Sequence, residues 1–456
     1  MIALLLFIFG IYCFEQKQDR VTFYFILQFL AMAGYAMLSW DREFVRMDDL
    51  ALIMLLYSFF RAGIYQKSNV ALVKVIYIYL AVVLLSTIVS FIYYQIPIVQ
   101  ILKGIRTSLY VLVFFDLKNM RTEEFHRLFY RIFLLTSFAS GLFCFECLTG
   151  ITPTIEIRGP GFLGLPRSYN CPPLVSFTCL YSVFVMDRKK KLFYPLLLLS
   201  FMTLFIIQSR GMIMVVLLTT ALGLSLKASA SNRIYISILA AGMSVFLISS
   251  LIFGGDTGDT TMNDFNKIAS GEFASANFED EGDATFTYRL NILAISVTKN
   301  CADPIRFFFG SGLVVEMPYS FFERWEMVEC CRFSINDYTY FTPDITFSNV
   351  IYNIGIMGLF VYMTLIGMML NMMLKWAEGK NGMEIVGAMF ILYLLLIALD
   401  SSILTWPNYL IVPFFFVQYV CVKHEADPSV KLLLFLLLLK SALIRRRGAL
   451  GEVVIE

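Results

Sequence analysis

Long apolar stretches separated by short polar connections dominate the hydropathy pattern of this chain. Residues 234–253 run for twenty positions without a charged side chain, and about a dozen other stretches resemble this one. A helix rises 1.5 Å per residue, so twenty residues extend about 30 Å, the thickness of the hydrocarbon core of a bilayer. Because lipid satisfies no backbone hydrogen bonds, the pattern predicts membrane-spanning helices.

The predicted fold is therefore all-α, a polytopic integral membrane bundle of about 12–13 spans. The alternating pattern of a membrane β-strand is absent. Segment 1–14 is the shortest apolar stretch at the amino end, and without it the count is twelve with both chain ends inside. The predicted spans are 1–14, 21–39, 50–66, 71–94, 97–116, 128–148, 171–186, 192–208, 211–226, 234–253, 347–371, 383–400 and 406–422.

Lysine and arginine residues cluster in alternate loops, and this asymmetry predicts the orientation. Positively charged loops face the cytoplasm, which places the N-terminus outside and the C-terminus inside. The basic loops contain Lys17 and Arg20; Lys67 and Lys74; Lys118, Arg121, Arg127 and Arg131; residues 188–191; Lys227 and Arg233; Lys375 and Lys380; and, in the tail, Lys423 and residues 445–447.

One segment between spans, residues 254–346, is long and strongly acidic. It holds fifteen Asp and Glu against six Lys and Arg, whereas the whole chain has a net charge of +2. A connection of this length points to an active-site or binding element. The predicted organisation is an N-terminal bundle (1–253), an external loop (254–346) with an amphipathic helix over 284–298, a C-terminal bundle (347–422) and a cytoplasmic tail (423–456).

Composition agrees with a membrane protein and excludes other classes. Hydrophobic residues make up 59% of the chain and charged residues 15%, against about 25% charged in a soluble domain. The small net charge gives no indication of nucleic-acid binding. Cys144 and Cys147 lie within one predicted span without a second pair, so helix packing is favoured over zinc. Cys301, Cys330 and Cys331 of the external loop are open to two interpretations, a disulfide or free thiols.

Three arginines on the predicted outer side contradict the usual charge distribution. Arg158 opens a Gly- and Pro-rich loop, Arg210 lies in a minimal turn between two spans, and Arg289 lies on the predicted amphipathic helix. One interpretation is that each anchors a helix at the lipid headgroups. The alternative is an anion site, because guanidinium groups bind phosphate through paired hydrogen bonds. Three of them could hold a diphosphate without a metal ion.

Other polar residues give weaker indications. Lys103 and Arg106 lie in the outer half of a span, where they either add positive potential or pair with another helix. Asp344 is the first candidate for a general base and Asp337 the second, although a solvated or capping role would explain either residue. The acidic cluster 279–283 could bind a divalent cation, but a solvated loop is the favoured interpretation.

Four short segments within residues 155–370 then form an ordered series: Arg158…Gly164…Asn170; Gln208-Ser-Arg-Gly211, continuing to Leu217; Arg289 followed by Asp303-Pro304 and Gly310-Ser-Gly312; and Ser348–Gly358. In order and topology this series resembles the O-antigen ligase and polymerase superfamily. The N-terminal half resembles that superfamily only as a helical bundle.

The resemblance implies a metal-independent, GT-C-like glycosyltransferase that uses undecaprenyl-diphosphate-linked glycans in the periplasm, with no cofactor. The protein would reside in the bacterial inner membrane, with a chain-length regulator as a further partner. Arg158, Arg210 and Arg289 would contact the donor diphosphate, with Asn170 and Asn349 also in the site. Ligases place His-Asn where this chain has Ser348-Asn349, which favours the Wzy-type polymerase branch and leaves the acceptor base unassigned.

Two alternatives compete with this hypothesis. An O-antigen ligase would transfer the glycan to lipid A–core, and the missing histidine counts against it. A lipid-linked oligosaccharide flippase or other transporter belongs to a different class. Such a protein would be expected to show charged residues lining a mid-membrane cavity and duplicated halves, and the sequence shows neither.

Overall fold

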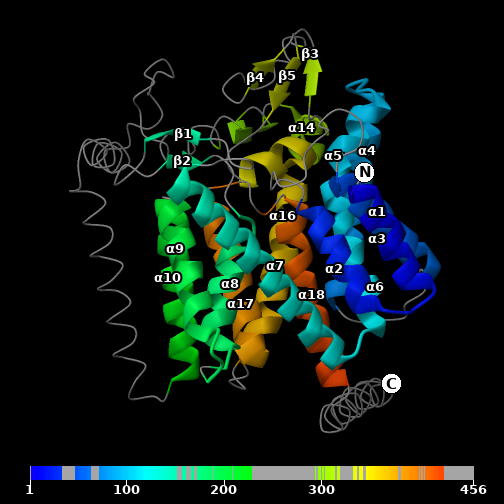
Figure 1. Cartoon of the computed structure of the whole chain (residues 1–456). Helices are drawn as coiled ribbons and strands as arrows, with labels where there is room; N and C mark the ends of the chain where they lie inside the picture. The colour runs from blue at the N-terminus through cyan, green and yellow to red at the C-terminus, as the bar shows by residue number, and fades with distance from the viewer. Residues whose placement is uncertain are drawn as a thin grey trace, which may run out of the picture.

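The chain forms a bundle of packed apolar helices with two small β-sheets at one end (Figure 1). This computed structural model describes residues 2–32, 47–62, 71–150, 157–160, 166–168, 172–187, 189–207, 209–228, 293, 296–298, 300–301, 303–313, 316–318, 332–335, 338–341, 346–377, 382–399, 401, 404 and 406–425.

Helices occupy every predicted span that falls within the described residues. Predicted span 234–253 lies outside them, and of the predicted amphipathic helix only Leu293 and residues 296–298 are described, all of them helical. The helices are α1 (Ile2–Glu15), α2 (Arg20–Ala31), α3 (Met47–Ala62), α4 (Ala71–Ile92), α5 (Ile98–Leu109), α6 (Val113–Asp116), α7 (Thr122–Thr149), α8 (Val175–Phe184), α9 (Phe193–Ile207), α10 (Arg210–Lys227), α14 (Pro304–Phe309), α16 (Thr346–Ala377), α17 (Gly382–Ile397) and α18 (Pro407–Glu425).

Four helical stretches in the described part of the chain are long and apolar enough to cross a membrane: Ala71–Ile92, Ile98–Asn119, Thr122–Thr149 and Thr346–Ala377. In the second of these, a 3-10 turn at Tyr110–Leu112 joins α5 to α6, and another at Leu117–Asn119 follows α6. Several further apolar helices have 10–17 residues. These helices identify the chain as a membrane protein.

The centre of the bundle is α18. Residues 408–420 of this helix are all buried, and α18 packs against α2, α7, α16 and α17. The rings of Phe129 on α7 and Phe416 on α18 stack with centroids 4.3 Å apart. A helix that is apolar on every side belongs in the interior of a bundle, and the sequences of α17 and α18 have this character.

Local signals fix where individual helices begin and end. At the start of α7, the Glu124 side chain accepts a hydrogen bond from the Arg121 amide at 2.7 Å. At its end, Gly150 takes the left-handed conformation (φ 72°), and its amide donates to the Glu146 carbonyl. This is a common way to end a helix. Asp303 caps α14 by accepting from the Ile305 amide at 2.8 Å, directly before Pro304.

The two sheets are an addition that the sequence did not predict. Strands β1 (Ile157–Pro160) and β2 (Pro166–Ser168) form an antiparallel pair. A second sheet has the order β3-β5-β4 and is antiparallel throughout, with Met317 opposite Thr339 and Thr339 opposite Ser334. Its strands are β3 (Glu316–Pro318), β4 (Arg332–Ile335) and β5 (Tyr338–Phe341). All five strands lie in segments between predicted spans, so the bundle itself is helical.

Figure 1 places both sheets and α14 at the same end of the bundle, and α18 ends at the opposite end. Both sheets and α14 come from segments that the charge pattern predicts to lie outside. We call the end of the molecule that holds them the outer end, and the end where α18 finishes the inner end. The fold therefore gathers the predicted external segments around the same ends of the helices.

Candidate functional site

A segment in the middle of the long polar region packs directly on the helix that follows that region. Helix α14 lies against α16, and the chain then turns through residues 310–313. Within this turn, the Ser311 amide donates to the Tyr352 carbonyl at 2.7 Å. Residues 303–313 and 346–358, which we call the α14–α16 junction, thus join two of the segments that carry the family resemblance.

Glycine residues allow the two backbones of the junction to touch. Gly310 and Gly355 both have positive φ, 81° and 73°, and Gly355 interrupts the helical conformation inside α16. A Cβ atom on Gly310 would lie 2.5 Å from the Tyr352 carbonyl oxygen, and one on Gly355 would lie 2.5 Å from the Phe308 carbonyl oxygen. Only glycine fits this combination of conformation and close approach. The kink in α16 therefore provides the surface against which the end of α14 packs.

A buried asparagine ties the junction together from one side. The Asn300 side-chain amide donates to the Ile351 carbonyl at 2.9 Å, and its oxygen accepts from the Ser311 hydroxyl at 3.2 Å. The Ile351 carbonyl lies in the turn before the kink at Gly355, where the regular helix is interrupted. Buried polar groups need hydrogen-bond partners. Here the side chain of Asn300 is the partner of both the Ile351 carbonyl and the Ser311 hydroxyl.

The outer end of α4 holds the junction from the other side. The Leu313 amide donates to the Ser90 hydroxyl at 2.9 Å, and the Tyr94 hydroxyl donates to the Gly310 carbonyl at 3.1 Å. Burial raises the pKa of Tyr94 to about 12, although the nearby Arg306 acts in the opposite direction. The phenol therefore keeps its proton at neutral pH and remains a donor.

Arg306 is a further arginine at the outer end, for which the sequence pattern predicted no role. It lies on α14 with only 15% of its side chain exposed, and its Nε lies 3.9 Å from the Asp303 carboxylate. Its positive charge is close enough to Tyr94 to act on the pKa of the phenol, which it lowers. The available signal was its position three residues after the capping Asp303, at the start of a short helix.

The first turns of α16 present a polar face. Asn349 and Asn353 are one helical turn apart and half-buried, and the Asn353 amide group donates to the Asn349 side-chain oxygen. Ser348 is fully buried, and its hydroxyl has no hydrogen-bond partner in the part of the chain that the structure describes. Of the Ser348-Asn349 pair, Asn349 is thus the more accessible residue.

Arg158 and Arg210 come from neighbouring elements at the outer end. Ile157 is paired with Ser168 and Gly159 with Arg167, so Arg158 is the extra residue of a β-bulge. Strand β2 contacts α9, the helix directly before Arg210. The backbones that carry these two arginines are therefore brought to the same part of the outer end.

Arg210 is the first residue of α10, where the helix dipole is positive. The Ser209 side chain caps this helix by accepting from the Met212 amide at 3.4 Å. A cation at a helix N-terminus is electrostatically unfavourable for the helix, whereas an anion there is favourable. A cation at the first residue of α10 is thus unfavourable for the helix, whereas a helix N-terminus is a common place for an anion to bind.

Arg106 is paired as the helix-pairing alternative predicts. Its guanidinium lies 3.2 Å from the Asp48 carboxylate and 3.1 Å from that of Asp49, both in the first turn of α3. Those carboxylates compensate its charge locally and connect α5 with α3.

Four other candidate residues lie outside the described part of the chain: Arg289, Asn170, Asp337 and Asp344.

Cysteine and metal chemistry are not indicated by the described residues. Within the described ranges, no group of three or more His, Cys, Asp and Glu side chains could hold a metal ion. Cys144 and Cys147 are buried on α7, and the Cys144 sulfur lies 3.3 Å from the Thr203 hydroxyl of α9, as expected for helix packing. Cys301 is an exposed free thiol; Cys330 and Cys331 lie outside the described ranges.

No protein-family model matches the chain, and no curated protein was found to be similar to it. The arrangement of residues at the outer end is therefore the main guide to function. That arrangement combines permanent cations on two neighbouring elements with a rigid junction that presents side-chain amides.

Proposed function

We propose that the protein is a Wzy-type O-antigen polymerase of the bacterial inner membrane, with its long loop in the periplasm and its C-terminus in the cytoplasm. One observation carries the proposal. Two segments that resemble superfamily motifs, 303–312 and 348–358, pack together at the end of the bundle that also holds Arg158 and Arg210. Substrates of this enzyme class are lipid-linked and would enter from the outer leaflet.

The reaction joins a growing glycan to the next lipid-linked repeat unit. The bond between the anomeric carbon and the phosphate oxygen breaks, and its electron pair goes to undecaprenyl diphosphate. A hydroxyl oxygen of the acceptor sugar forms the new bond to that carbon and gives its proton to a base. Negative charge builds on the leaving diphosphate, so preorganised cations lower the barrier, each by roughly 3–4 kcal/mol on the scale of oxyanion-hole donors.

The proposed roles follow from position. Arg158 and Arg210 bind the diphosphate, aided by the amides at the start of α10, and Arg289 is the third arginine of this set. Asn349 and Asn353 are suited to hydrogen bonding with sugar hydroxyls, and Asn170 is assigned to the same substrate. Since α16 begins at Thr346, Asp344 precedes it by two residues and remains the first candidate base, ahead of Asp337.

The proposal is tested by replacing Arg210 with Ala and with Lys in the encoding strain. Both variants should reduce the yield of polymer by about 100-fold or more. The product with a single repeat unit should remain. Lysine should fail because a point charge cannot replace the bidentate guanidinium contact. Arg61→Gln is the matched control, since Arg61 lies at the inner end and is 67% exposed.

The surface polysaccharide ladder and the amount of protein in the membrane are the measurements. A full ladder from either Arg210 variant at normal expression would exclude the diphosphate role. Loss of even the single capped repeat unit would indicate the ligase instead. Accumulation of lipid-linked repeat units on the cytoplasmic side would indicate the flippase.

A further inference from the structure

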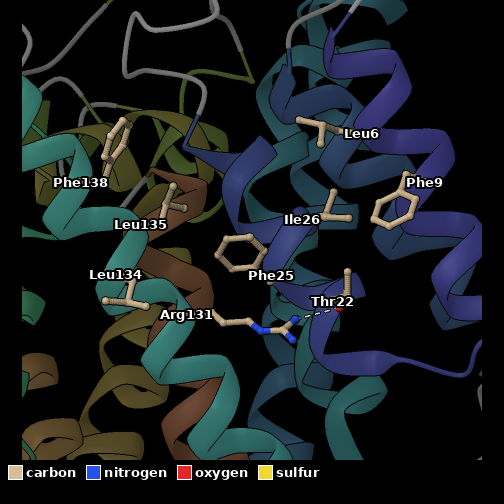
Figure 2. Close-up of a pocket in the computed structure, with 9 residues that line it drawn as sticks. All are labelled: Leu6, Phe9, Thr22, Phe25, Ile26, Arg131, Leu134, Leu135 and Phe138. Atoms are coloured by element: carbon tan, nitrogen blue, oxygen red, sulfur yellow. Dashed lines mark hydrogen bonds between the residues drawn. The ribbon is translucent and has the colours of Figure 1, made fainter.

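A lateral cleft opens on the side of the bundle between α1, α2 and α7, away from the outer end (Figure 2). Its volume is about 510 Å³, within the roughly 300–1,000 Å³ of typical ligand pockets. Most of its lining is apolar, and the polar side chains among its described lining residues are those of Thr22 and Arg131. The apolar lining residues are Leu6, Phe9, Phe25, Ile26, Leu134, Leu135 and Phe138.

The apolar walls of the lateral cleft are open to the surroundings of the protein. Phe138 is 68% exposed, and Phe9 and Leu134 are also exposed. In Figure 2 the apolar side chains of α7 face those of α1 and α2 across the gap. These helices belong to the membrane bundle, so the medium that reaches this surface is lipid. A hollow of this kind fits a hydrocarbon chain.

A cation marks one end of the cleft. The Arg131 guanidinium donates to the Thr22 hydroxyl at 2.8 Å, and that hydroxyl donates to the Asp19 carboxylate. Arg131 lies nine residues, roughly 14 Å, along α7 from its inner end, and three residues inside the predicted span 128–148. A charge near the end of a span can reach the headgroups of the inner leaflet.

The charges around this end are positive in sum. Arg127 lies one helical turn closer to the inner surface, on the same face of α7 as Arg131, and its side chain is exposed. Residues 17–20 and 121–131, at this end of the cleft, hold five Lys and Arg against three Asp and Glu. A basic group near a membrane surface favours anionic lipid by about 1 kcal/mol.

We propose that the lateral cleft binds one anionic glycerophospholipid of the inner leaflet. An acyl chain lies along the apolar walls formed by α2 and α7, and the phosphate is bound by Arg131 and Arg127. The cleft is separate from the α14–α16 junction and from Arg158 and Arg210. The proposal therefore holds whether or not the protein is a polymerase.

The test is native mass spectrometry of the full chain in detergent, with phosphatidylglycerol or phosphatidylcholine of identical acyl chains. The wild type should retain phosphatidylglycerol about 30-fold better, the ratio that corresponds to two basic contacts of about 1 kcal/mol each. Arg131→Gln and Arg127→Gln should each reduce this preference to about fivefold. Lys189→Gln, in an exposed loop between α8 and α9, is the matched charge control and should leave the preference unchanged.

A second variant tests the apolar part of the cleft. Leu135→Trp fills the hollow and should lower the binding of both lipids, with a thermal melting curve to show that the variant is folded. Equal binding of the two lipids by the wild type, or an unchanged preference in Arg131→Gln, would refute the proposal. Displacement of phosphatidylglycerol by undecaprenyl phosphate, or disulfide cross-linking between copies through Phe138→Cys, would assign the cleft to another occupant and overturn it.

Discussion

The α14–α16 junction and the lateral cleft represent two different ways of building a surface in the same bundle. In the junction, backbone meets backbone: Gly310 and Gly355 allow carbonyl and amide groups to approach within hydrogen-bonding distance. In the cleft, separate helices face each other through apolar side chains with an open gap, and one hydrogen bond, from Arg131 to Thr22, crosses it.

This difference predicts which amino-acid substitutions each region tolerates. A contact between backbones depends on residues that have no side chain, so almost any substitution there introduces a clash. A cleft lined by Leu, Ile and Phe depends on volume and polarity, and lipid can fill the space that a smaller side chain leaves. The junction should therefore be rigid and intolerant, and the cleft adaptable. The following substitutions test this contrast in decreasing order of expected effect.

Gly355→Ala should produce the largest loss. The left-handed conformation costs a residue with a side chain about 1–2 kcal/mol, and the Cβ contact with the Phe308 carbonyl adds about 1–3 kcal/mol. We expect the free energy of unfolding in detergent to fall by about 2–5 kcal/mol. Thermal unfolding of the purified protein measures it.

Gly367→Ala is the matched control on the same helix. A Cβ at Gly367 meets nothing within 4 Å, so alanine should be neutral or stabilise α16 by up to about 1 kcal/mol. If Gly355→Ala melted at the temperature of Gly367→Ala, the junction would not be held by close backbone approach.

Ser90→Ala should give the next largest effect. The change removes the hydroxyl that accepts from the Leu313 amide and leaves that buried group without its partner. The expected loss is about 1–3 kcal/mol, together with faster hydrogen exchange at residues 310–313. Ser86→Ala is the control, because the Ser86 hydroxyl is buried one turn earlier on α4 and has no hydrogen-bond partner among the described residues. Equal losses in both variants would contradict the role of Ser90.

Tyr94→Phe should cost about 1 kcal/mol by removing the hydrogen bond to the Gly310 carbonyl. It should also change the response to alkali. The pKa of Tyr94 is raised from 10 to about 12 in the folded protein, so its contribution is fully present below pH 10 and is lost as pH rises towards 12. The variant lacks this component, and melting curves between pH 9 and 11.5 should show a shallower decline than for wild type.

Thr22→Val should have the smallest effect, since it acts at the open cleft. Burial opposes ionisation of Asp19, but hydrogen bonds from the Thr22 hydroxyl and amide outweigh it and lower the pKa of this carboxyl. The stabilisation is present above the ordinary pKa of Asp and is lost as pH falls through the lower folded value. The expected change is under about 1 kcal/mol because solvent screens the pair. A loss that is equally large at pH 3 and pH 7 would contradict this account.

The helices of the bundle could be predicted from the sequence, but the contacts at their outer ends could not. Apolar runs such as Ala71–Ile92 need no tertiary information, because a backbone in lipid must form its own hydrogen bonds. Strands β1–β5 escaped prediction because they are three or four residues long and lie in segments without a regular pattern. The pairing of Arg106 with Asp48 and Asp49 could be stated only as an alternative, since it depends on how α5 meets α3.

The sequence by itself determined that this chain is a helical membrane protein, and it predicted arginines in the alternate loops where basic residues are rare. Hydrophobic length and charge position decide these properties, and both are linear features of the chain. Only the tertiary structure decided that residues 303–313 pack against the kink at Gly355 and that Arg158 lies at a bulge in a strand pair that contacts α9. It also decided that α1, α2 and α7 leave an apolar cleft ending at Arg131. Each of these depends on the packing of elements far apart in sequence, which no local pattern encodes.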